Sequence, residues 1–263
     1  MNANARLTTL TRVGFAARGL LYIVIALLVI RAGRAESPSG ALEYLGDGGG
    51  RVLLVVMATG LLAYSVWRLA DAAFDIERHG SSQEGMMERL GAAASGLVHL
   101  FLTWQAVRLI QGAASAGDGT REGARTALQL PGGGTLVVVA GVILLGVGAF
   151  QLIKAVKGSF LCHLEPQVAR QPWAQWSGRA GYAARGFVFL ISSFFLLKAG
   201  FQERASEAGG TTEALSWLSS PLDIVVAAGL FAFGLFSLIE ARFRILHDVP
   251  VDGIARRATG GGF

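Results

Sequence analysis

Six apolar stretches, each of a length that can cross a lipid bilayer, constrain the fold of this chain more than any other feature. They cover residues 13–32, 51–72, 90–112, 134–156, 179–200 and 221–243. A helix needs about 20 residues to cross a hydrocarbon core of about 30 Å. Charged residues make up only 16% of the sequence, whereas soluble domains carry about 25%. The sequence therefore predicts an all-α integral membrane protein with six spans.

Short motifs recur three times along the chain, always in the same order. A Gly-x-x-x-(Arg/Ser)-Gly motif opens every odd-numbered apolar stretch, at residues 14–19, 91–96 and 181–186. A short amphipathic stretch follows, starting at Ala41, Ala127 and Ala214. A glycine-to-basic motif ends every even-numbered stretch, at residues 60–68, 146–154 and 234–242. The repeats predict three tandem helical hairpins, at 10–78, 88–158 and 177–246, and a C-terminal tail at 247–263.

The distribution of basic residues predicts how these hairpins are oriented. Fifteen of the 23 Lys and Arg residues fall on the side that holds both termini and the linkers between hairpins, and eight fall on the other side. Positively charged segments stay in the cytoplasm. Both termini are therefore expected to be cytoplasmic, and all three hairpins point the same way. This predicts a six-helix bundle with a pseudo-threefold arrangement.

Two arginines, Arg18 and Arg185, lie inside the membrane edge of their predicted spans. The uncharged part of the first span, residues 19–30, is too short to cross, so the helix must extend back through Arg18. A guanidinium at this depth is costly unless it pairs, faces a polar cavity or reaches the headgroups. Two interpretations stay open: binding of an anionic headgroup or substrate, or anchoring of the helix at the lipid phosphates. Ser95 holds the corresponding position of the second repeat.

His99, Gln105 and Gln151 are polar candidates within the spans. His99 falls near the middle of the third span, and Gln105 lies about two turns further on. An imidazole at this depth can relay protons or bind a cofactor, or it can hydrogen-bond across the bundle. Gln151 is of a residue type that commonly joins helices by hydrogen bonds.

Glu240 is the candidate carboxylate, and it stands near the end of the last span. A buried carboxylate needs a cation, so we expect it to pair with Arg185 or Arg18. Counted from the glycine of the third motif, Val66 and Leu152 hold the position of Glu240 in the other repeats. On this count the ion pair would be unique to the third repeat.

Several function classes lack support in the sequence. The net charge is +5, but the basic residues sit at the ends of apolar runs, which indicates membrane placement and no nucleic-acid partner. We find no paired catalytic carboxylates, nucleophile elbow, zinc motif or dinucleotide fingerprint. The four histidines show no metal-ligand spacing, and the single cysteine, Cys162, excludes an intrachain disulfide. No metal and no catalytic residue are predicted, and a cofactor stays unknown.

With the three repeats aligned, the chain resembles the bacterial membrane family of domain of unknown function 1206. The resemblance rests on the Gly14, Arg18, Gly19 and Tyr22 pattern and on the two later motifs of each hairpin, and it runs from about residue 10 to 246. It implies three two-helix units in a bacterial inner membrane, and it implies no activity. The second repeat departs from the pattern at Ser95 and His99, and the third at Phe189.

Three function hypotheses follow from these features. The first is a non-enzymatic membrane scaffold that binds a membrane partner or anionic lipid at its cytoplasmic face. The second is a transporter or channel for a small solute or ion, with a polar path near His99. The third is a membrane protein that binds a cofactor or metal through His99. A filled centre of the bundle favours the first hypothesis, and a polar cavity that reaches His99 favours the second.

Overall fold

Six long helices dominate the computed structural model, which describes residues 3–33, 35–112 and 119–245. They are α1 (Ala3–Ala32), α2 (Pro38–Phe74), α3 (Gln83–Ile110), α5 (Gly133–Lys157), α7 (Pro172–Gln202) and α9 (Leu222–Phe243). Each contains a segment that is long and apolar enough to cross a membrane. The predicted all-α membrane protein with six spans is confirmed. The predicted tail at 247–263 lies outside the described residues.

A short helix stands between the long helices of the second and third units. These are α4 (Gly119–Leu128) and α8 (Thr211–Trp217). In the first unit the corresponding segment is the beginning of α2, which is set apart by a kink at Gly50, where φ is 70°. All three units therefore share one order of elements, long, short and long; the amphipathic stretches from Ala41 and Ala214 fall in these short segments, whereas the one from Ala127 overlaps only the end of α4.

Contacts between successive units are the most extensive contacts in the bundle. The second long helix of each unit packs on the first long helix of the next, so the pairs are α2 with α3, α5 with α7 and α9 with α1. Glycines allow the backbones to approach closely in two of these pairs. A Cβ added at Gly19 would lie 2.8 Å from the carbonyl oxygen of Gly234, and one at Gly186 would lie 2.9 Å from that of Gly148. This cyclic pairing is the threefold element of the fold.

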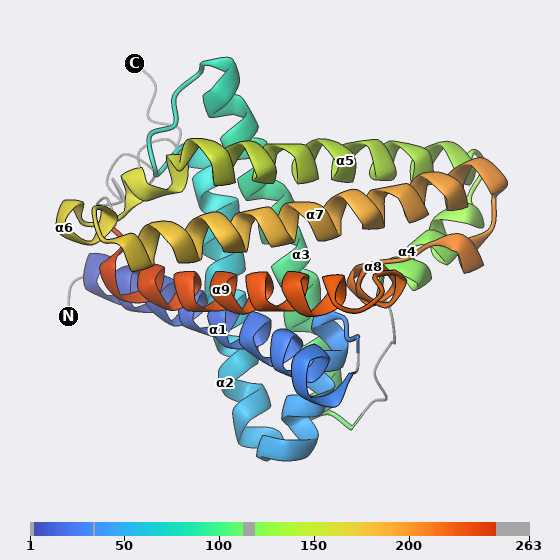
Figure 1. Ribbon diagram of the computed structural model, residues 1–263, viewed down its shortest axis with the longest axis horizontal. Helices are drawn as coiled ribbons and strands as arrows, with labels where there is room; N and C mark the ends of the chain where they lie inside the picture. Colours follow the sequence, from blue (N-terminus) through green and yellow to red (C-terminus); the bar gives the residue numbers. More distant parts are fainter. Residues whose placement is uncertain (1–2, 34, 113–118, 246–263) are drawn as a thin grey trace, which may run out of the picture.

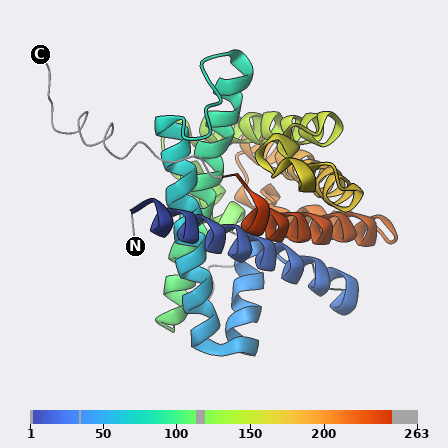
Figure 2. The same cartoon turned by 90° about the vertical axis from the view of Figure 1, so that its left-hand side faces the viewer.

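The second unit departs from the other two. Inside the first unit Gly14 and Gly60 bring α1 and α2 together, and inside the third Gly181 and Gly229 bring α7 and α9 together. The helices α3 and α5 have no comparable contact among the described residues, and a Cβ added at Gly91 would meet nothing within 4 Å. In Figures 1 and 2, α2 and α3 run across the other four long helices.

Candidate functional site

Arg18 of α1 forms the centre of a buried cluster that joins three helices. Its side chain is 5% exposed. It donates to Ser237 Oγ of α9 at 3.1 Å, to the hydroxyl of Tyr64 of α2, and to Glu240 Oε2 of α9. Its guanidinium carbon also lies 4.8 Å from the ring centroids of Phe15 and Tyr64. The predicted ion pair with Glu240 is present, and the partner is Arg18 and not Arg185.

The cluster continues from Glu240 toward the linker between α2 and α3. Arg244, the residue after α9, donates to the other oxygen of Glu240 and to both oxygens of Glu77, the latter with its Nη2 at 2.6 Å. Burial would raise the pKa of Glu77, but Arg244 and then His163 lower that pKa to about 2. Burial would lower the pKa of Arg244, but Glu77 and Glu240 raise it. This part of the site is therefore a charged chain of alternating sign.

Two histidines complete the cluster at Glu77. Glu77 Oε2 lies 3.7 Å from Nε2 of His79 and 3.4 Å from Nε2 of His163. The ring of His79 also lies against Asp71, with Nε2 and Oδ2 3.3 Å apart. This hydrogen bond is the main cause that raises the pKa of His79. Burial, and then the charge of Arg244, lowers the pKa of His163 to about 4, so its imidazole is neutral at neutral pH.

Local backbone geometry brings the two linkers together. Gly158, with φ at 71°, ends α5, and the 3-10 helix η1 (Ser159–His163) follows at once. The backbone of Leu164 then forms an isolated bridge with Arg244. The N–H of Ile245 donates to the carbonyl of His163 at 2.8 Å. The linker after α5 is thereby fastened to the end of α9, beside the linker that carries His79.

The structure corrects the position that we expected to match Glu240 in the other repeats. The same helix crossing occurs where Gly234 meets Gly19, where Gly148 meets Gly186, and where Ser65 Oγ donates to the carbonyl of Gly96. Six residues after each crossing stand Glu240, Lys154 and Asp71. The matching residues are therefore Asp71 and Lys154, and not Val66 and Leu152. Counting from Gly60 and Gly146 failed because those glycines precede the crossing by five and two residues.

Each of these three matching positions carries a charged side chain in an ion pair. Asp71, fully buried, lies 3.4 Å from Arg68. Lys154 lies 2.8 Å from Glu88 of α3. Glu240 pairs with Arg18 and Arg244. An ion-paired charge at this position is thus a feature of all three units; it is buried in the first and third and partly buried in the second, where its sign is reversed.

Of the other predicted residues, Arg185 lies outside this cluster and His99 lies at its edge. Arg185 is half-buried, and its guanidinium carbon lies 5.0 Å from the ring centroids of Phe189 and Phe233. It is not among the residues that hydrogen-bond to Glu240 in the described part of the chain. His99 joins the edge of the cluster, because its ring centroid lies 4.5 Å from that of Tyr64. Its Nδ1–H donates to the carbonyl of Ser95 at 2.7 Å, which leaves Nε2 as the acceptor.

Two glutamines are buried without joining His99. Gln105 is 2% exposed and Gln151 is 8% exposed. The Nε2 atoms of His99 and Gln105 are buried and have no hydrogen-bond partner among the described atoms. Among the described residues no hydrogen bond links Gln151 to His99 or Gln105, so a polar path through these three residues stays a prediction.

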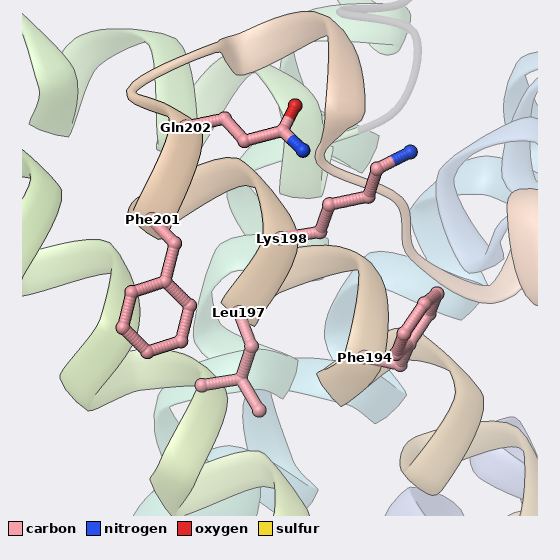
Figure 3. Close-up of a pocket in the computed structure, with 5 residues that line it drawn as sticks. All are labelled: Phe194, Leu197, Lys198, Phe201 and Gln202. Carbon is pink, nitrogen blue, oxygen red and sulfur yellow. The ribbon is translucent and has the colours of Figure 1, made fainter.

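A pocket of about 380 Å³ lies elsewhere, on the outer side of α7 (Figure 3). All five residues that line it come from one stretch of that helix, Phe194, Leu197, Lys198, Phe201 and Gln202. Phe201 is 74% exposed. None of the predicted site residues borders this pocket, and its position suits contact with lipid more than binding of a solute.

The arginine that stands two residues before the opening glycine of each repeat was not predicted to have a role. Arg89 donates to the carbonyls of Ala72 and Ala73 at the end of α2, and Arg179 donates to those of Ala155 and Val156 at the end of α5. Such donors satisfy the last carbonyls of a helix. Arg12 holds the same position in the first unit. The signal was available, since an arginine stands two residues before the opening glycine of every repeat.

Comparisons with known proteins agree with this register. The family model described as Domain of Unknown Function (DUF1206) matches residues 13–75, 90–158 and 180–244. Each segment ends four residues after one of the matching charged positions, Asp71, Lys154 and Glu240. The chain is also similar to the uncharacterized protein YxxB of Bacillus subtilis (strain 168), with 26% identity over 246 residues, or 89% of this chain and 90% of the relative. No solved structure matches the chain.

Proposed function

The chain belongs to the family of Domain of Unknown Function (DUF1206), and from this premise we propose that it is a non-enzymatic membrane scaffold that binds a transmembrane helix of a partner protein. The partner helix would lie on the face formed by α3 and α5. This proposal names one occupant for the side of the bundle where the threefold packing is incomplete.

The exposure of α5 carries the proposal. Only 22% of its most apolar window is buried within the protein, compared with 39–61% for the other five spans. In the first and third units a glycine, Gly60 or Gly229, meets the opening helix at close range. In the second unit Ile143 stands at that position and is 57% exposed. Helix α3 does not pack extensively on α5, so both helices keep a surface that the other units bury.

The filled centre of the bundle favours a scaffold over a transporter. Tyr64, Ser237 and Glu240 are each at most 2% exposed, and each accepts a hydrogen bond from the buried Arg18. A buried ion pair of this kind keeps its partners fixed, because separating them leaves an uncompensated charge. Arg18 is therefore occupied inside the protein and does not reach a lipid headgroup.

We further propose that the protein lies in the bacterial inner membrane with both termini in the cytoplasm. The excess of Lys and Arg on the side of the linkers supports this orientation. On that side the Lys157 side chain is 62% exposed. Anionic lipid is therefore a second, weaker ligand, bound at the cytoplasmic face of the protein.

Photo-crosslinking in native membranes tests the proposed helix partner. A photoreactive residue replaces Gly91 or Ile143 on the open face, and Val225, 63% exposed on α9, serves as the matched lipid-facing control. We expect one discrete adduct of the same mass from both open-face positions and none from Val225. An adduct with the mass of a second copy, or equal adducts from all three positions, contradicts the proposal.

A further inference from the structure

Three metal-ligating side chains from two linkers converge at one point outside the spans. Glu77, His79 and His163 each offer one candidate ligand atom, and these three atoms all lie within 4.8 Å of one another. Glu77 and His79 belong to the linker between α2 and α3, and His163 belongs to the linker between α5 and α7. The three side chains are 4%, 8% and 16% exposed. The cluster is therefore shielded but lies close enough to the surface for an ion to enter.

The separations of these atoms match those in a metal site. Tetrahedral Zn²⁺ with bonds of 2.0–2.1 Å places neighbouring ligand atoms about 3.3 Å apart. Glu77 Oε2 lies 3.4 Å from His163 Nε2 and 3.7 Å from His79 Nε2. Both nitrogens and the oxygen are of the types that bind zinc and similar ions. Small movements of the side chains are enough to enclose an ion.

From this geometry we propose that Glu77, His79 and His163 bind a divalent transition-metal ion of the Zn²⁺ class. The fourth position is left to water or to Asp71, whose Oδ2 lies 3.3 Å from His79 Nε2. The inference is independent of the proposed scaffold function, because the three ligands lie in the linkers and not in the membrane spans of α3 and α5. Histidine spacing could not reveal the site, since 84 residues separate the two histidines in sequence.

The surroundings of Glu77 determine what the ion would do. Arg244 holds both oxygens of Glu77, which orients the carboxylate toward the histidines but also competes with an ion for it. We therefore expect weaker binding than at a site with an unshared carboxylate. An ion bound here would fasten the first and second linkers to each other and, through Arg244, to the end of α9. Its expected role is to stabilise the arrangement of the three units.

Metal titration of the full chain tests the proposal. The purified protein, free of a histidine tag and stripped with a chelator, is titrated with Zn²⁺ by calorimetry, and its melting temperature is followed. We expect one ion per chain and a higher melting temperature with Zn²⁺. His79→Asn and His163→Asn should each weaken binding at least tenfold and abolish the rise in melting temperature. Cys162→Ser, next to His163 but outside the ligand set, is the matched control and should bind as the unchanged protein does.

A second measurement keeps the test sound if a histidine variant does not fold. Co²⁺ bound to the unchanged protein should give the ligand-field bands of a four- or five-coordinate nitrogen and oxygen site. A thiolate charge-transfer band would place Cys162 in the site and overturn the assignment. Absence of saturable Zn²⁺ binding to the unchanged protein, or equal affinity in folded His79→Asn and His163→Asn variants, would also overturn it.

Discussion

Glu240 is the residue on which the buried cluster depends most. Its two oxygens face Arg18 and Arg244, so one carboxylate pairs with two guanidiniums that are 5–6% exposed. Breaking a buried ion pair by removing one partner costs about 3–5 kcal/mol. We expect Glu240→Gln to lower the free energy of unfolding by about this amount, measured by thermal or denaturant unfolding in detergent micelles. Glu84→Gln is the matched control, because its pair with Lys157 is exposed and should contribute far less.

A double-mutant cycle separates the ion pair from a general loss of packing. Arg244 keeps Glu77 as a partner when Glu240 is neutral, whereas Arg18 keeps only uncharged ones. The variant Arg18→Met with Glu240→Gln should therefore lose less stability than the sum of the two single variants, by about 0.5–3 kcal/mol. Additive losses would mean that Arg18 and Glu240 are not coupled as the structure has them.

Single residues also show where prediction from sequence ends. The depth of Arg18 and the need of Glu240 for a cation follow from hydropathy and the cost of buried charge. The choice of Arg18 over Arg185 does not follow, because both arginines open a repeat in the same way. It depends on which helix lies beside α9, and short motifs on the surface of a helix do not specify its neighbour. The cluster of Glu77, His79 and His163 was hidden for the same reason.

Close contact between helices depends on a few glycines, and their contributions can be told apart. A Cβ at Gly234 would lie 2.6 Å from Ile23 and 2.8 Å from the carbonyl oxygen of Gly19, so α9 and α1 would have to separate. We expect Gly234→Ala to lower the free energy of unfolding by about 1–3 kcal/mol. Gly146→Ala is the control, since a Cβ there meets nothing within 4 Å.

The control has an expected sign of its own. Alanine is more favourable than glycine inside a helix by about 0.5–1 kcal/mol. Gly146→Ala should therefore leave stability unchanged or raise it, in the same unfolding experiment. Equal destabilisation by both variants would contradict the assignment of the loss to contact between α9 and α1, because Gly146→Ala introduces no such contact.

The long helices themselves are the best-predicted elements. The expected spans differ from the structure by a few residues at most of their ends. Helix α1 starts ten residues earlier, at Ala3, and helices α3 and α7 start about two turns earlier, because Ser82 caps α3 and Pro172 begins α7. Hydropathy cannot detect these polar first turns, since they lie outside the apolar core of the span. The alignment of the second helix of each repeat was wrong because glycines recur more than once per helix.

The three units together form a ring of contacts that is open in one place. Pairing of α2 with α3, α5 with α7 and α9 with α1 repeats around the molecule, while among the described residues α3 and α5 lack the extensive packing that joins the two long helices of the other units. The sequence predicts the ring, because the opening motif recurs three times. It does not predict the opening, where Ile143 stands at the position that holds glycine in the other units.

The side of the membrane that each linker faces can be tested with the one native cysteine. Cys162 is exposed and lies in the linker after α5. The structure brings this linker against the one after α2, with the rings of His79 and His163 5.9 Å apart. In a Cys162→Ser background, Ser81→Cys should therefore react with an impermeant maleimide from the same side as native Cys162, and Ser206→Cys from the opposite side.

The measurement uses intact cells and inverted membrane vesicles. We expect Cys162 and Ser81→Cys to react only in inverted vesicles, because basic linkers stay in the cytoplasm. Reaction of these two positions from opposite sides would contradict the fold, whereas reaction of both from outside would contradict only the orientation.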